Sequence, residues 1–135
     1  MTRELTIHTP GQGLHLITGQ VSEVVRDSGQ QDGLCTIFIR HTSASLVVQE
    51  NADPSARRDL ERWLGRLVPE NDPLYTHHEE GPDDMPAHVK AALTATSISI
   101  PIIGGILALG TWQGIYLWEH RRAPHQRRVV VHIGP

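Results

Sequence analysis

The feature that most limits the fold of this chain is the order of its strand-like and helix-like apolar patterns. Those patterns follow one another as two strands, a helix, two strands, two helices and four strands. A parallel doubly wound sheet requires strands and helices to alternate strictly, and this chain does not alternate them. The sequence therefore predicts an α+β fold with mainly antiparallel, sandwich-like sheets and about three helices.

The strand pattern is carried by eight short segments. They are residues 5–8, 14–17, 34–40, 46–49, 97–101, 106–109, 113–119 and 128–133. Between the first and second pairs, Thr18 is the expected N-cap of a helix that ends near Gly29. Its inner face is predicted to consist of Val21, Val24 and Val25.

Two further helices are expected in the middle of the chain. Asp53 is a good N-cap and Pro54 a good first helical residue. The inner face of that helix is predicted from helical spacing to comprise Ala56, Leu60, Trp63, Leu64 and Leu67. After a polar loop over residues 70–84, the next helix should begin near Pro86. Its predicted inner face comprises Val89, Ala92, Leu93 and Thr96.

Size and charge limit the classes of function. A chain of 135 residues fits one domain, predicted over residues 1–135, and its net charge of −3 with scattered basic residues argues against nucleic-acid binding. No stretch approaches the roughly 20 apolar residues that span a bilayer, so no membrane segment is expected. Cys35 stands alone in an apolar strand pattern, which predicts a buried thiol and a cytoplasmic location.

Three of the nine histidines are candidate metal ligands. Each lies at a loop or at the end of an element, beside other polar groups: His41, His77 and His88. Neutral imidazole is a common metal ligand, and a site needs several such donors that converge from separate segments. A structural or solvated role remains the alternative, and it is the preferred interpretation for the other six histidines.

Carboxylates near these histidines could act as acid or base, or orient a ligand. The candidate catalytic residues are His41, Glu80, Asp84 and Glu119. Asp84 has the alternative of capping a helix. Glu119 ends a strand, where its side chain could point into a site, and its alternative is a structural ion pair.

A third group offers donors for phosphate oxygens. It comprises Ser43, Ser45, Asn51, Lys90, Gln113 and Arg128. Hydroxyls at a strand corner also satisfy backbone groups, and a helix lysine can simply be solvated, so a structural role stays open for this group. Gln113 follows Trp112 in a turn that enters a strand, where Trp112 is expected to fill volume.

Several strings of residues, taken together, resemble the YjbQ family, also described as a secondary thiamine-phosphate synthase family. The most specific are residues 41–46 (His-Thr-Ser-Ala-Ser-Leu), 83–90 (Asp-Asp-Met-Pro-Ala-His-Val-Lys) and 110–115 (Gly-Thr-Trp-Gln-Gly-Ile). They occur in the order typical of the family, and the resemblance extends from Gly13 to Val131.

The resemblance implies an α+β fold, a homotrimer and a thiamine-phosphate synthase activity on small phosphorylated substrates. That reaction joins a hydroxymethylpyrimidine diphosphate to a thiazole phosphate and releases pyrophosphate. A divalent metal, zinc or magnesium, could assist it, although the chain has no acidic diphosphate-metal motif and histidine ligands suit zinc better. The alternatives are a zinc-dependent hydrolase and a non-catalytic trimeric protein that binds a small ligand or a metal.

Overall fold

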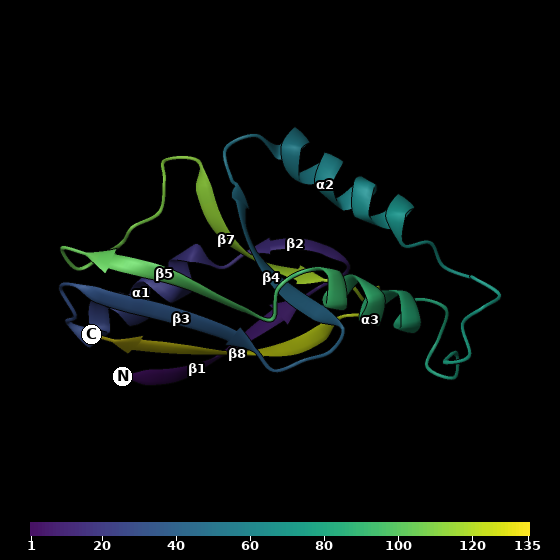
Figure 1. The fold of residues 1–135 in the computed structure, drawn as a ribbon, viewed down its shortest axis with the longest axis horizontal. Coiled ribbons are helices and arrows are strands. Elements are labelled where there is room, and N and C mark those ends of the chain that lie inside the picture. Colours follow the sequence, from purple (N-terminus) through teal and green to yellow (C-terminus); the bar gives the residue numbers. More distant parts are fainter.

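A computed structural model describes the whole chain, from Met1 to Pro135, and confirms the α+β class with three helices and two antiparallel sheets. The elements are β1 (Thr2–Thr9), β2 (Gly13–Leu16), α1 (Thr18–Ser28), β3 (Gly33–Ile39), β4 (Ala44–Glu50), α2 (Pro54–Leu67), α3 (Asp84–Leu93), β5 (Ser97–Ile103), β6 (Ile106–Leu107), β7 (Gln113–Glu119) and β8 (His125–Gly134). Their order is the one predicted (Figure 1). The main differences are that β1 and β8 are longer than expected and that α3 begins two residues earlier.

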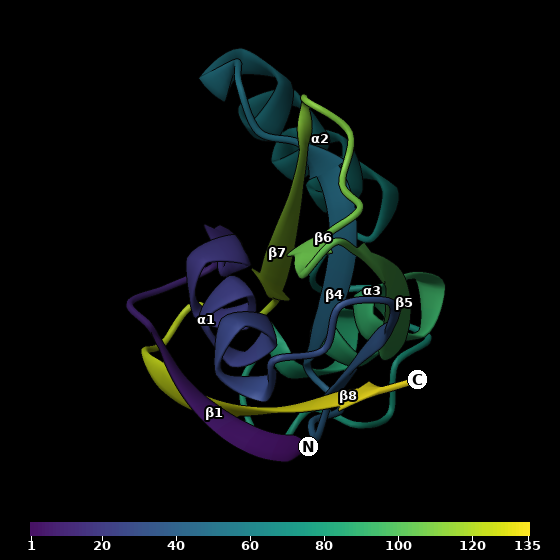
Figure 2. The same ribbon diagram turned by 90° about the vertical axis from the view of Figure 1, so that its left-hand side faces the viewer.

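Every strand pair in both sheets is antiparallel. One sheet has the order β1-β8-β3-β5-β6 and the other the order β2-β7-β4. Figure 2 shows α1 between β7 and the curved pair formed by β1 and β8. The chain passes from one sheet to the other between β7 and β8, so a short connection there links neighbouring layers.

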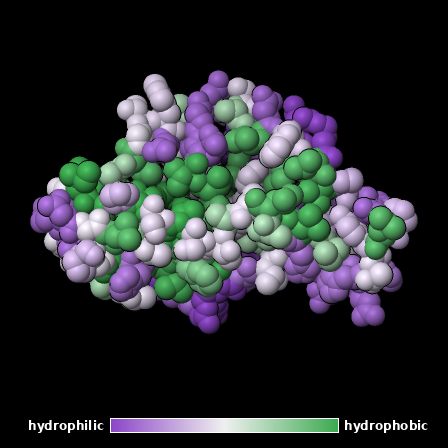
Figure 3. Space-filling view, in the orientation of Figure 1, coloured by the Kyte–Doolittle hydropathy of each residue, from purple (hydrophilic) through white to green (hydrophobic).

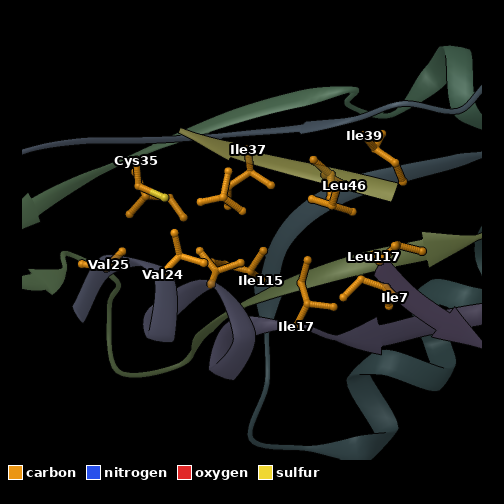
Figure 4. Close-up of a cluster of buried hydrophobic side chains, with 14 of the residues drawn as sticks. Ile7, Ile17, Val24, Val25, Cys35, Ile37, Ile39, Leu46, Ile115 and Leu117 are labelled. Carbon is orange, nitrogen blue, oxygen red and sulfur yellow. The ribbon is translucent and has the colours of Figure 1, made fainter. Parts of the chain in front are cut away.

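The larger core fills the space between the two sheets and α1. Figure 4 shows its side chains converging from β3, β7 and α1, among them Ile37, Ile115 and Val24. Cys35 belongs to this core, as predicted, and burial raises the pKa of its thiol to about 11. A thiol with this pKa stays protonated at neutral pH, which disfavours a nucleophilic role.

A smaller core lies on the outer face of the three-stranded sheet. There Leu14 of β2 and Tyr116 and Trp118 of β7 pack against Leu64 and Val68, at the end of α2. Alternate residues of β7 therefore enter different cores, because successive side chains of a strand point to opposite faces. Both α2 and α3 cover this outer face.

The ends of α1 and α2 follow from local chemistry, with one correction. Asp53 caps α2 as predicted, accepting a hydrogen bond from the Ser55 backbone N–H. Gly29 ends α1 in the left-handed conformation that suits glycine. The prediction that Thr18 caps α1 is wrong: Ile17 is the N-cap, and the Thr18 hydroxyl instead accepts from the Ile115 N–H.

The predicted inner faces of α2 and α3 are wrong in part. Leu64 is buried in α2, but Trp63 and Leu67 are exposed. The buried residues of α3 are Asp84, Pro86, Ala87 and Lys90, and none of the four predicted inner residues is among them. Apolar periodicity fails in α3 because the side of this helix that faces the protein carries charged groups.

Apolar side chains also remain on the surface. Trp112, expected to fill volume, is exposed, and so are Ile103 and Ile106 around the turn between β5 and β6. Figure 3 shows apolar surface gathered over β5 and beside α3 on this face. None of the three helices combines the length and the apolar character that crossing a membrane requires.

A candidate metal centre between the α2–α3 loop and α3

The fold brings His77, Asp84 and His88 together. His77 comes from the loop between α2 and α3, Asp84 is the first residue of α3, and His88 follows one helical turn later. The Asp84 Oδ2 lies 2.8 Å from the His77 Nε2 and 3.2 Å from the His88 Nε2. This cluster could hold a metal ion.

The tautomer of His88, that is, which ring nitrogen carries the proton, explains why these donors suit a cation. The His88 Nδ1 lies 2.8 Å from the Thr42 carbonyl oxygen. Because a carbonyl oxygen only accepts, Nδ1 must carry the proton, and in the neutral ring the Nε2 lone pair then faces the Asp84 carboxylate. Two lone pairs at this distance repel each other unless a proton or a cation lies between them. A backbone carbonyl that fixes the tautomer is also typical of metal-binding histidines.

The three donor atoms lie within 4.8 Å of one another, and two of their separations are close to those around a small tetrahedral ion. Zinc ligands about 2.0–2.1 Å from the ion lie about 3.3 Å from one another in a tetrahedron. The two measured separations, 2.8 and 3.2 Å, are close to that value. Two imidazoles and one carboxylate form a three-ligand set, and such sets leave a position open for water or substrate.

Arg121 holds Asp84 in place from the other side. Its guanidinium donates to the Asp84 Oδ1 at 2.9 Å, to the Asp83 Oδ2 at 3.1 Å and to the Glu80 carbonyl oxygen at 2.9 Å. Burial alone would raise the pKa of Asp84. The hydrogen bond to His77 and the neighbouring His88 and Arg121 groups outweigh burial, so the pKa of this carboxyl lies below its usual value.

A pocket of about 550 Å³ opens beside the cluster. His77 lines it, together with Tyr75, His78 and Met85. A volume in this range accommodates a small organic ligand. None of the six predicted substrate-binding residues lines this pocket.

His41 does not join the cluster, although it was predicted as a ligand with His77 and His88 and as a catalytic residue. Its Nε2 accepts the Arg128 backbone N–H at 2.8 Å, which occupies the lone pair that a metal would use. Burial and the nearby Arg127 charge lower the pKa of His41, so its ring stays neutral.

Glu80, also predicted as a catalytic residue, does not place its carboxylate in the cluster. Its backbone carbonyl accepts a hydrogen bond from Arg121, and its side chain is exposed.

Glu119 is buried completely and fully hydrogen-bonded. It accepts from the Arg127 Nε at 2.7 Å, from the Arg127 Nη2, from the Thr9 hydroxyl at 2.6 Å and from the Arg121 backbone N–H at 3.1 Å. Burial alone would raise the pKa of Glu119, but the bonds from Arg127 and Thr9 lower it. The carboxylate therefore stays ionised and cannot serve as a general acid, and it touches the candidate metal centre only through Arg121.

The predicted phosphate-binding group is dispersed. Ser43 and Ser45 are buried, where Ser43 accepts from Arg127 and Ser45 pairs with His120. The others lie elsewhere: Asn51 and Gln113 at the far ends of β4 and β7, Arg128 on β8 beside Glu4, and Lys90 in a separate cavity. These six residues do not form one phosphate site within the chain.

Sequence reasoning missed Arg121, Thr42 and His120. Arg121 could have been found from the sequence. Two adjacent aspartates, at 83 and 84, favour a nearby cation, and only two pairs of adjacent arginines follow them in the chain, at 121–122 and 127–128. Thr42 acts through its backbone and had no signal. His120 was placed among the structural histidines, yet it is nearly inaccessible and lines the separate cavity.

A family model described as "UPF0047 protein YjbQ-like" matches residues 3–135. The chain belongs to this family. The UPF0047 protein sll1880 of Synechocystis sp. is 56% identical over 129 residues, covering 96% of this chain and 88% of the relative. The UPF0047 protein YjbQ of Escherichia coli O157:H7 is 41% identical, covering 95% and 93%.

Solved structures agree with the fold of this UPF0047 chain. The conserved hypothetical protein TT1486 from Thermus thermophilus has a TM-score of 0.88 at 36% identity, covering 98% of this chain and 99% of that one. The hypothetical protein APE1520 from Aeropyrum pernix has a TM-score of 0.90 at 29% identity, covering 99% and 98%. These similarities establish the family and the fold, and they assign no reaction.

Replacing Glu119 by glutamine should destabilise the protein by about 3–5 kcal/mol, because Arg127 would be left buried with an uncompensated charge. Urea unfolding followed by circular dichroism measures this change. Glu4→Gln, which weakens the exposed ion pairs of Glu4 with Arg40 and Arg128, should have a far smaller effect. Equal effects of the two substitutions would contradict this account.

Acid should destabilise the protein through His120. Burial, followed by the charge of Lys90, lowers the pKa of His120 from 6.5 to about 3. Between these values the unfolded state binds a proton that the native state rejects. Stability is therefore complete above about pH 6.5 and falls by up to about 1.4 kcal/mol per pH unit as the pH drops toward 3. His120→Gln should flatten this slope between pH 6.5 and 5 in urea unfolding curves, and parallel curves would refute the assignment.

Proposed function

We propose that this protein is a metal-dependent enzyme in which His77, Asp84 and His88 hold a divalent ion and a small phosphorylated substrate occupies the neighbouring pocket. The observation that carries the proposal is the pair of ring nitrogens aimed at the Asp84 Oδ2. Zinc suits this donor set better than magnesium, which prefers oxygen ligands in an octahedral arrangement.

The residues of the chain have separable tasks in this proposal. Thr42 fixes the tautomer of His88, and Arg121 keeps Asp84 ionised and in position. Tyr75, His78 and Met85 border the pocket and would orient the substrate. A bound divalent ion would supply stabilisation of the negative charge that develops on a departing phosphate or pyrophosphate group.

The finer proposal is a thiamine-phosphate synthase-like transferase, as the family resemblance implies. The bond between the methylene carbon on the pyrimidine ring and the diphosphate oxygen would break, pyrophosphate would leave with the electron pair, and the thiazole nitrogen would form the new bond to that methylene carbon. One observation favours a zinc-dependent hydrolase as the second candidate, namely the His-Asp-His set with an open position. Purified protein should be tested with hydroxymethylpyrimidine diphosphate plus thiazole phosphate and, separately, with generic phosphoesters. If neither turns over, a non-catalytic binding protein remains.

Zinc should bind to the purified chain with one-to-one stoichiometry. His88→Ala should weaken zinc binding by more than about 100-fold, because loss of a residue that merely hydrogen-bonds to a metal ligand already weakens metal binding by about 10–100-fold. Isothermal titration calorimetry gives both values. The matched control is His78→Ala, because His78 neighbours His77 but lies outside the cluster. Unchanged zinc affinity in His88→Ala would remove this residue from the site.

We also propose that the protein assembles as a homotrimer. An apolar groove of about 520 Å³ between β4, β5 and the end of α3 supports this proposal, and Leu93 at its rim is exposed. Exposed apolar surface of this kind is typical of interaction sites. Light scattering at micromolar concentration should give three times the chain mass, and a monomer would contradict the proposal.

A further inference from the structure

The only lysine of the chain is buried in a cavity that the proposed metal enzyme does not use. Lys90 is 7% exposed, and none of its side-chain atoms forms a hydrogen bond or an ion pair. Burial lowers the pKa of Lys90, because its ammonium loses water contacts that no hydrogen bond from the protein replaces, although the Nζ keeps some access to solvent. The position of Lys90 in the last turn of α3 gives it a favourable helix dipole, and the charges of Glu70 and Asp83 act on it from a distance, but no carboxylate forms an ion pair with it.

The cavity lies between the outer face of the three-stranded sheet and the helices α2 and α3. It has a volume of about 110 Å³, and Lys90, His120, Trp118, Gln12 and Glu61 line it. This volume equals that of three or four waters at about 30 Å³ each, which is far below the roughly 300 Å³ or more of a drug-sized ligand pocket. The pocket beside His77 shares no lining residue with it.

A second polar group is available beside Lys90. His120 is 1% exposed, and its Nε2 is paired with the Ser45 hydroxyl at 2.9 Å, while its Nδ1 forms no hydrogen bond within the protein. Neither this nitrogen nor the Lys90 Nζ is fully shut off from solvent. If the Ser45 hydroxyl donates to Nε2, the neutral ring carries its proton on Nδ1 and can donate there. Lys90 and His120 together then offer hydrogen-bond donors from two walls of one small cavity.

The carboxylate of Glu61 limits what this cavity accepts. Its Oε2 receives the Leu14 backbone N–H at 3.0 Å. Glu61 forms no ion pair with Lys90, although both line the cavity, and its negative charge disfavours a ligand with several negative charges. The cavity therefore suits a ligand that carries a single negative charge on an oxyanion group better than a ligand that carries several negative charges.

We propose that this cavity is a second binding site, in which Lys90 and His120 bind the oxyanion of a small carboxylate or of a monobasic phosphate. Charge complementarity to an ammonium that lines the cavity without a hydrogen-bond or ion-pair partner, together with the small volume, selects this class of ligand. Trp118 closes one wall with an apolar surface and limits the ligand to a few heavy atoms. The site is independent of the metal centre and holds whether or not the chain is an enzyme.

The single lysine makes the test specific. In protein labelled with ¹³C at the lysine Cε, the side chain gives one NMR cross-peak, which should shift and saturate on titration with acetate or with inorganic phosphate at constant ionic strength. Sodium chloride should produce no saturating shift. Whichever anion binds more tightly identifies the carboxylate or the phosphate as the ligand group. A shift that grows linearly with every anion would mean non-specific ion binding only and would overturn the proposal.

Substitutions separate the site from general charge effects. Isothermal titration calorimetry should show that Lys90→Met weakens anion binding at least tenfold, the factor expected for loss of a charge-assisted hydrogen bond. Arg66→Gln, which removes an exposed cation of α2, should leave the affinity unchanged. Lys90→Met should also raise the melting temperature, since it removes a partly desolvated charge that has no ion-pair partner. Equal loss of affinity in both variants, or a lower melting temperature with unchanged affinity, would refute a binding role for Lys90.

Discussion

The buried ion pair between Glu119 and Arg127 is the interaction on which the rest of the structure depends. Glu119 ends β7 in one sheet and Arg127 lies on β8 in the other, so the pair joins the two layers where the chain crosses between them. Thr9 adds a hydrogen bond from β1. A buried pair is no stronger than good apolar packing, but it demands one geometry, and here that geometry sets the path of the connection between β7 and β8.

At the connection between β7 and β8, the side chains of three consecutive residues point in three different directions. Glu119 points between the sheets, His120 points outward to the cavity under α2 and α3, and Arg121 reaches Asp84. The strand alternation of β7 accounts for the first two directions, since successive side chains face opposite sides. The backbone N–H of Arg121 donates to Glu119, so the ion pair that joins the sheets also positions the guanidinium that holds the candidate metal ligand.

Local patterns in the sequence predict most of the fold but only part of the site. The strands and α1 follow from periodicity, and the Asp53 cap of α2 follows from side-chain chemistry. The inner face of α3 could not be predicted this way, because Asp84 is buried by virtue of Arg121, which lies 37 positions later. His77 and His88 were predicted as candidate ligands and do converge, whereas His41, predicted with them, pairs with a backbone N–H that no sequence pattern reveals.

The same helix serves the metal centre and the anion cavity on different sides. At about 100° per residue, His88 lies about 40° from Asp84 around α3, while Lys90 lies about 120° from it. The cluster and the cavity therefore occupy separate faces of one short helix whose first residue is held by Arg121. A ligand that shifts the backbone of α3 at Lys90 would also shift Asp84 and His88, whereas a rearrangement of the Lys90 side chain alone would leave them in place. The two sites share no lining residue, yet they are mechanically joined through the backbone of α3.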